Sequence, residues 1–161
     1  MRADVADEVR AAWARLQPGV DTAPIDIVHR VLRAARLIEL SSDAELAAFG
    51  LTRPELELLM LLRRTDAALS PSAIAQELLF TAPATSKRLK ALEGRGLLSR
   101  VVNPADRRGA LIGLTDAGRE LVDAAFPTNL RSEAKLLATL TPAQHERVTR
   151  ALRELLTALA R

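Results

Sequence analysis

Apolar residues recur every three or four positions along most of this chain, with polar residues between them, which is the pattern of amphipathic helices. Ser, Thr and Asp accept the free amides of a first helical turn, and Gly or Pro interrupts a helix, so these residues divide the pattern into separate elements. The predicted helices span residues 4–16, about 24–49, 53–64, 71–79 and 81–94, with a long helix after Thr115 and a last one from Thr141-Pro142 to about Ala160.

Two short stretches depart from the helical period. Residues 97–102 and 110–114 are apolar or β-branched, which favours strands. Asn103-Pro104-Ala105-Asp106 lies between them and has the chemistry of a turn, because Asn and Asp bond to nearby backbone and Pro presets φ. The pattern therefore predicts a β-hairpin within a chain that is otherwise mainly α.

The helix at 81–94 is the most informative predicted element. Its inward face consists of Thr85, Leu89 and Leu92, which helical spacing places together. Small side chains let a backbone approach DNA closely, while interspersed cations meet phosphates. The alternative is an ordinary amphipathic helix with a solvated basic face. The candidate DNA-contacting residues, on the outward face and its flanks, are Pro83, Ala84, Ser86, Lys87, Arg88 and Lys90.

The turn of the predicted hairpin leads into two arginines. Asp106 can hold one guanidinium of Arg107 or Arg108 by a charge-assisted bond, which leaves the other for a minor groove or a phosphate. The alternative is a surface turn with a weak ion pair. A helix suited to the major groove beside a hairpin with arginines near its tip is the outline of a winged helix-turn-helix, and we include all three residues in the candidate DNA site.

The distribution of charge supports this interpretation. The formal net charge of the whole chain is only +3. Residues 71–119 hold eight cations and four anions, a net +4, so the rest of the chain sums to −1. The basic excess therefore lies in the segment predicted to contact DNA.

Composition excludes several other classes of protein. The chain has 161 residues, of which 48% are apolar, enough to bury a core in one domain or two small lobes. It contains no cysteine, which excludes disulfides and thiol chemistry. No uncharged run approaches the roughly 18 residues of a membrane span, and the N-terminus does not read as a secretory signal, so we expect a cytoplasmic protein without membrane contact.

The segment from the basic helix through the hairpin resembles the MarR family of bacterial transcription regulators. The similar residues are the run from Lys87 to Leu97, the Asp106-Arg107-Arg108 pattern followed by Leu114-Thr115, and Thr115-Asp116-Ala117-Gly118-Arg119. The similarity extends through residues 51–78 and more weakly to both ends, so it covers nearly the whole chain.

This resemblance implies an architecture and a function. Residues 1–50 and 116–161 are expected to form the dimerisation core, and residues 51–115 the winged helix-turn-helix. The expected protein is a homodimer that binds double-stranded DNA at a palindromic operator, as a ligand-responsive repressor. The alternative is a winged helix used only for protein–protein contact, which the basic excess of residues 71–119 disfavours.

The terminal helices give an independent reason to expect a dimer. They are too apolar to stand free, and pairing with a second subunit would cover them. The alternative is that they pack within one chain. The apolar residues of the two last helices include Leu121, Val122, Leu130, Leu136, Leu137, Leu140, Val148, Leu152, Leu155, Leu156 and Leu159.

An enzyme is not expected, and neither is a metal or a cofactor. His29 and His145 are the only histidines, and the chain contains no HxxxH, CxxC, phosphate loop or nucleophile elbow. A site for a small aromatic or anionic effector is the better hypothesis. The only tryptophan, Trp13, lies on the extra N-terminal helix near which some MarR-family members bind such ligands. Trp13 would stack on the ring and His29, Arg33 or Arg36 would neutralise the anion; alternatively, Trp13 only anchors its helix.

Overall fold

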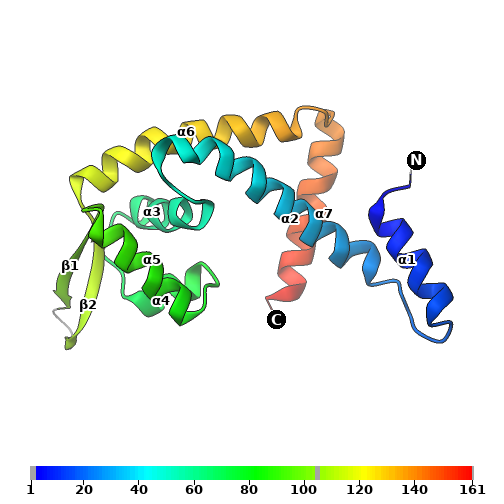
Figure 1. Ribbon diagram of the computed structural model, residues 1–161, viewed down its shortest axis with the longest axis horizontal. Coiled ribbons are helices and arrows are strands. Elements are labelled where there is room, and N and C mark those ends of the chain that lie inside the picture. The colour runs from blue at the N-terminus through cyan, green and yellow to red at the C-terminus, as the bar shows by residue number, and fades with distance from the viewer. Residues whose placement is uncertain (1–2, 104–105, 161) are drawn as a thin grey trace.

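Helices make up most of the chain, and a single hairpin accompanies them. The computed structural model describes the backbone of residues 3–103 and 106–160, and the side chains of these residues except 103 and 106–108. Figure 1 shows helices α3, α4 and α5 with the hairpin at one end of the molecule, α1 and α7 toward the other, and α2 and α6 between them. The mainly helical winged helix-turn-helix predicted from the sequence is confirmed for the described residues.

The first two helices begin and end at the predicted signals. Asp4 caps α1 (Val5–Leu16) through bonds from the amides of Ala6 and Asp7. The longer α2 (Ile25–Leu46) continues into a 3₁₀ turn, η1 (Ala47–Phe49), and ends at Gly50, whose φ of +62° suits glycine. The α2 helix packs against α6, and α1 packs against α2.

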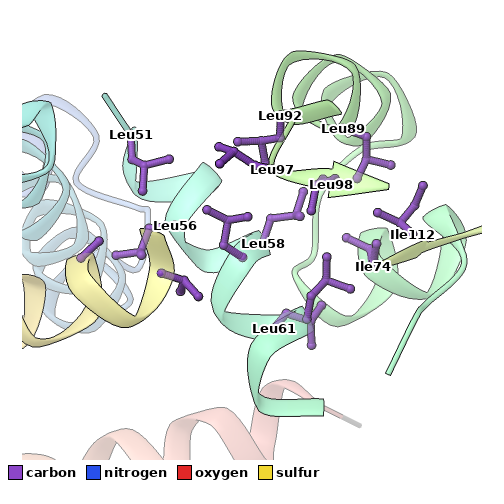
Figure 2. Close-up of a cluster of buried hydrophobic side chains, with 14 of the residues drawn as sticks. Leu51, Leu56, Leu58, Leu61, Ile74, Leu89, Leu92, Leu97, Leu98 and Ile112 are labelled. Atoms are coloured by element: carbon purple, nitrogen blue, oxygen red, sulfur yellow. The ribbon is translucent and has the colours of Figure 1, made fainter. Parts of the chain in front are cut away.

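The winged-helix unit consists of α3 (Arg53–Thr65), α4 (Pro71–Glu77), α5 (Ala82–Gly94), β1 (Leu98–Asn103) and β2 (Asp106–Leu114). Thr52 and Glu55 form a capping box at the start of α3, and Ser70 and Thr81 cap α4 and α5. Leucines of α3 and α5 meet Ile74 of α4 and Ile112 of the hairpin in one buried cluster, shown in Figure 2. That cluster joins the helices and the wing into one packed unit.

Most boundaries lie within one residue of the prediction, but the end of α4 and the start of β2 differ by more. The α4 helix ends at Glu77 rather than at residue 79, because Leu79 takes a left-handed conformation with φ +54° and starts the turn into α5. The β2 strand begins at Asp106, four residues before the expected start, so Arg107 and Arg108 lie on a strand rather than in a turn. Pairing of Asn103 with Asp106 across the hairpin explains this difference.

The wing is antiparallel and is tied to the rest of the unit by one more segment. Leu98 pairs with Leu114 at its base, and the register holds as far as Val102 with Ala110, where it shifts by a bulge. Leu69 adds an isolated bridge, with two backbone hydrogen bonds of 2.8 and 2.9 Å to Ile112. This third pairing fixes the hairpin against the start of α4.

The last two helices differ in how well one chain covers them. The α6 helix (Asp116–Leu137) runs on through Pro127 without a break and buries Val122, Ala125 and Asn129 among other residues. The α7 helix (Pro142–Leu159) has no buried residue at all, although Leu152, Leu156 and Leu159 lie on it. Much apolar surface of α7 is therefore open to solvent in a single chain.

Candidate nucleic-acid interface

The α5 helix presents a solvent-facing surface in the orientation predicted from its periodicity. Its inward residues Thr85, Leu89 and Leu92 are buried. The Thr85 hydroxyl donates to the Thr81 carbonyl at 3.1 Å, which satisfies the one polar group of that face. Among the candidate DNA contacts, Pro83, Ser86, Lys87 and Lys90 are exposed, while Ala84 and Arg88 are half-buried.

The cations of this helix are not equivalent. No described carboxylate lies within 4.0 Å of Lys87 or Lys90, so no described anion competes for these two ammonium groups. Arg88 lies over the Phe80 ring, 4.6 Å from its centroid, a cation–π contact that holds the guanidinium beside the start of α5. The sequence analysis did not anticipate Phe80 as the partner of Arg88.

Two further arginines near α5 are engaged in structural contacts. Arg95 donates to the Gly50 carbonyl at 2.9 Å and so ties the end of α5 to the end of η1. Arg100, on β1, pairs with Glu93 at 2.9 Å. Both add positive charge to this side of the molecule, but their guanidinium groups hold the unit together.

The tip of the wing carries the remaining candidate residues. The backbone of Asp106, Arg107 and Arg108 is part of β2. Their side chains lie outside the described residues, and so do Pro104 and Ala105 of the expected turn. The predicted bond between Asp106 and an arginine falls in this part of the chain and stays a prediction.

The start of α6 fixes the base of the wing. Thr115 caps α6 by accepting from the Gly118 amide at 3.1 Å, and its hydroxyl donates to the Gly96 carbonyl at 2.7 Å. The Thr115 amide donates in turn to the Leu97 carbonyl at 3.1 Å. The end of α5, the hairpin and α6 are thus held at one junction.

The residues predicted to contact an effector are spread along α1 and α2. Trp13 is 50% exposed on α1. On α2, His29 is half-buried and Arg33 and Arg36 are exposed. Arg33 lines a cavity of about 640 Å³ between the two helices, and Arg36 pairs with Glu39 at 3.2 Å. The four side chains lie on neighbouring helices, and their joint role in binding stays a prediction.

Arg30, which the sequence analysis did not single out, fastens α1 to α2. It binds Asp4 at 2.9 Å and Asp7 at 2.7 Å. The hydrogen bond from Arg30 is the main cause that lowers the pKa of Asp4. For Asp7, the Asp4 backbone amide lowers the pKa most, followed by Arg30. Arg10 adds a contact of 2.5 Å to Asp26, so charged side chains join α1 to α2 at several points.

A more enclosed apolar cavity lies elsewhere, between α3 and α6. It has a volume of about 530 Å³, and Met60, Leu78, Val122 and Phe126 contribute apolar walls, with Arg53 also on its lining. In the described part of the chain, no group of three or more His, Cys, Asp and Glu side chains is arranged to hold a metal ion. No helix that the structure describes is both long and apolar enough to cross a membrane.

Comparison with known proteins finds relatives of this chain in both sequence and structure. The sequence model of the MarR family matches residues 49–109. The regulator PecS of Dickeya dadantii is 32% identical over 137 residues, which are 84% of this chain and 82% of PecS. The repressor Rv2887 of Mycobacterium tuberculosis is 29% identical over 84% of this chain and 95% of its own length. The Staphylococcus aureus MepR–DNA complex superposes with a TM-score of 0.74 at 27% identity, over 82% of this chain and 97% of that one.

Proposed function

Because this chain belongs to the MarR family of transcription regulators, we propose that it acts as a homodimer that binds a palindromic operator and represses transcription. The observation that carries the proposal is the outward surface of α5. It offers small side chains and the cations Lys87 and Lys90 beside the wing. The similar MepR protein is solved in complex with DNA, and Rv2887 is a repressor, which supports both parts of the proposal.

The α5 helix and the wing have separate proposed roles in DNA binding. The α5 helix enters the major groove, where Ser86 and Lys87 reach base edges or phosphates and Pro83 and Ala84 allow close approach. Arg88 lies on a flank of this surface and Lys90 lies beside its centre, and both bind the phosphate backbone. Arg107 and Arg108 of the wing bind the minor groove or the adjacent phosphates, with Asp106 orienting one guanidinium.

A dimer would cover apolar surface that one chain leaves exposed. Val28 and Leu32 of α2 and Leu152 and Leu156 of α7 are open to solvent. Solvent-exposed leucines in such number are typical of an interface between subunits. We place dimerisation in residues 1–50 and 116–161 and DNA binding in residues 51–115. Because the two subunits of such a dimer are related by a two-fold axis, the DNA site that they bind must be palindromic.

The proposed regulator responds to a small aromatic or anionic molecule. Trp13 offers a ring for stacking, and His29, Arg33 and Arg36 offer positive charge on the neighbouring helix. Such a ligand changes DNA affinity only through unequal affinity for the DNA-binding and non-binding arrangements of the dimer. The apolar cavity between α3 and α6 is a second candidate site, because it is bounded by both the winged-helix unit and a long helix of the dimerisation region.

Two other functions have less support. PecS, Rv2887 and MepR are transcription regulators rather than enzymes. We propose a binding role without catalysis, in the cytoplasm. A winged helix used only for protein contact would not require the net charge of +4 that residues 71–119 carry. The exposed lysines of α5 favour the nucleic-acid function.

Selection from a random pool of DNA duplexes tests the proposal with the full-length chain. We expect enrichment of a palindrome whose half-sites are about 10 base pairs apart, because two recognition helices related by a two-fold axis enter successive major grooves. The double variant Lys87→Ala, Lys90→Ala should lose this enrichment. The matched control is Lys135→Ala, which removes the third and last lysine of the chain. Absence of any enriched sequence with the wild-type protein would refute the proposed function.

A further inference from the structure

A polar cluster centred on Arg53 joins three helices at the boundary of the winged-helix unit. Arg53 is the first residue of α3, and its Nη1 donates to Glu133 of α6 at 2.5 Å and to Ser42 of α2 at 3.1 Å. The same nitrogen lies 3.3 Å from the Asn129 amide oxygen, and Nε donates to Glu57 at 2.9 Å. Asn129 also donates to Glu133 at 2.9 Å, so the cluster is a connected network.

This cluster is shielded from solvent. Ser42 and Asn129 are buried, and the side chains of Arg53 and Glu133 are only 20% and 27% exposed. The backbone amide of Arg53 also donates to Asp43 of α2 at 3.1 Å. Breaking a shielded charge pair leaves its partner uncompensated, so such a contact resists displacement far more than an exposed pair does.

A second ion pair joins α3 to α6 further along the two helices. Arg63 of α3 binds Asp123 of α6 at 2.9 and 3.1 Å. Arg53 and Arg63 are ten residues apart, and so are Glu133 and Asp123, so the two helices run antiparallel and are tied at two points about 15 Å apart. The second pair is 43% and 53% exposed and therefore holds less firmly.

We propose that Arg53 is a positioning residue that sets the angle between the winged-helix unit and the long helices α2 and α6, and thereby the half-site spacing that the dimer accepts. The inference rests on the proposed function, since it concerns the separation of two α5 helices on one operator. Without the Arg53 side-chain contacts, α3 keeps its apolar packing against α6 and its pair at Arg63, but it loses the shielded polar contacts that fix the angle of its first turn to α2 and α6. A change in the angle of α3 reaches α5 because Leu89 and Leu92 pack in the same core as the leucines of α3.

The test compares operators that differ only in spacing. The probes are the duplex returned by the selection experiment and two copies with one base pair added or removed at the centre. One base pair turns the half-sites relative to each other by about 35° and shifts them by about 3.4 Å. Wild-type protein should prefer the selected spacing by about tenfold or more in Kd, and Arg53→Met should reduce that preference below about threefold.

Two other variants make the result specific. Arg63→Met, the matched control at the exposed tie, should keep the wild-type spacing preference. Glu133→Gln disturbs the same cluster from α6 without altering the first turn of α3, and it should also broaden the accepted spacing even if Arg53→Met folds poorly. Lys87→Ala, by contrast, should weaken all three probes by the same factor, because it removes a DNA contact and leaves the angle unchanged.

The outcomes separate this inference from the proposed function. If wild-type protein binds the palindrome and both cluster variants keep its spacing preference, the role of Arg53 is refuted while the proposed function stands. A wild-type protein that tolerates all three spacings equally also refutes it. If wild-type protein binds no selected duplex, the proposed function itself fails.

Discussion

Gly118 packs directly against the carbonyl group of Leu97, at the junction of α6 with the wing. A Cβ added to Gly118 would lie 2.1 Å from the Leu97 carbonyl oxygen, well inside van der Waals contact. Leu97 is buried and its carbonyl accepts the Thr115 amide, so this backbone has little freedom to retreat. The glycine is therefore required by close approach rather than by its own φ.

Gly118→Ala should accordingly destabilise the protein by about 1–3 kcal/mol, because a methyl group forced into a packed junction displaces backbone. Urea unfolding of both proteins measures the difference. Gly94→Ala is the matched control, since nothing lies within 4 Å of a Cβ there, and it should be neutral or slightly stabilising. Equal unfolding midpoints for Gly118→Ala and the wild type would show that the junction yields easily.

Leu79 offers the opposite test, a position where glycine should help. Its φ is +54°, a left-handed conformation that costs a residue with a Cβ about 1–2 kcal/mol, and its side chain is 92% exposed. Leu79→Gly should raise the free energy of unfolding by about 0.5–1 kcal/mol after the added freedom of the unfolded chain is subtracted. Leu79→Ala keeps the Cβ and should bring no such gain. A destabilised Leu79→Gly protein would mean that the Leu79 side chain makes a contact that outweighs the strain.

The contact of α1 with α2 through Asp4, Asp7 and Arg30 should weaken only at acid pH. The pKa values of Asp4 and Asp7 are lowered, so their contribution is complete above the ordinary carboxyl pKa of about 4 and is lost as pH falls below it. Trp13, the only tryptophan, reports α1 through its fluorescence. We expect constant emission from pH 8 to about 5 and a change below about pH 4.

Arg30→Ala should give the acid-like Trp13 emission already at neutral pH, because it removes the partner of both carboxylates. Arg36→Ala removes a pair that lies within α2 alone and is the control. A transition between pH 8 and 5 in the wild type would contradict this account of how α1 is held.

Lys87 separates base recognition from backbone binding. If its ammonium group reaches a base edge, Lys87→Ala should cost about 1–3 kcal/mol in DNA binding and relax preference at one position of each half-site. If it reaches only phosphate, the variant should bind all sequences more weakly and show a shallower salt dependence. Fluorescence anisotropy on the selected operator and on single-position variants measures this, with Lys135→Ala as the control. A Lys87→Ala protein that behaves like the control would exclude Lys87 from the interface.

Local signals in the sequence were sufficient for most of the fold. Thr52, Ser70, Thr81 and Thr115 each cap the helix that their position predicts, because capping depends on neighbouring residues alone. The spacing of the buried residues on α5 likewise predicts which surface of that helix faces solvent. The start of β2 was predicted wrongly, since strand length depends on pairing with the opposite strand, which a single stretch of sequence does not show.

The contacts that join distant segments were beyond sequence reasoning. Arg53 precedes Glu133 by eighty residues, and nothing in the residues around either indicates the partner. Arg30 and Asp4 are likewise brought together only by the packing of α1 on α2.

The salt dependence of operator affinity tests the central claim most directly. Each phosphate that the protein neutralises contributes about −0.9 to the slope of log affinity against log salt concentration, and six to ten contacts per dimer are ordinary. For wild-type protein on the selected operator we expect a slope between about −5 and −9. A slope near zero between low and moderate salt would contradict the account, because the cations of α5 and the wing would then not be binding DNA.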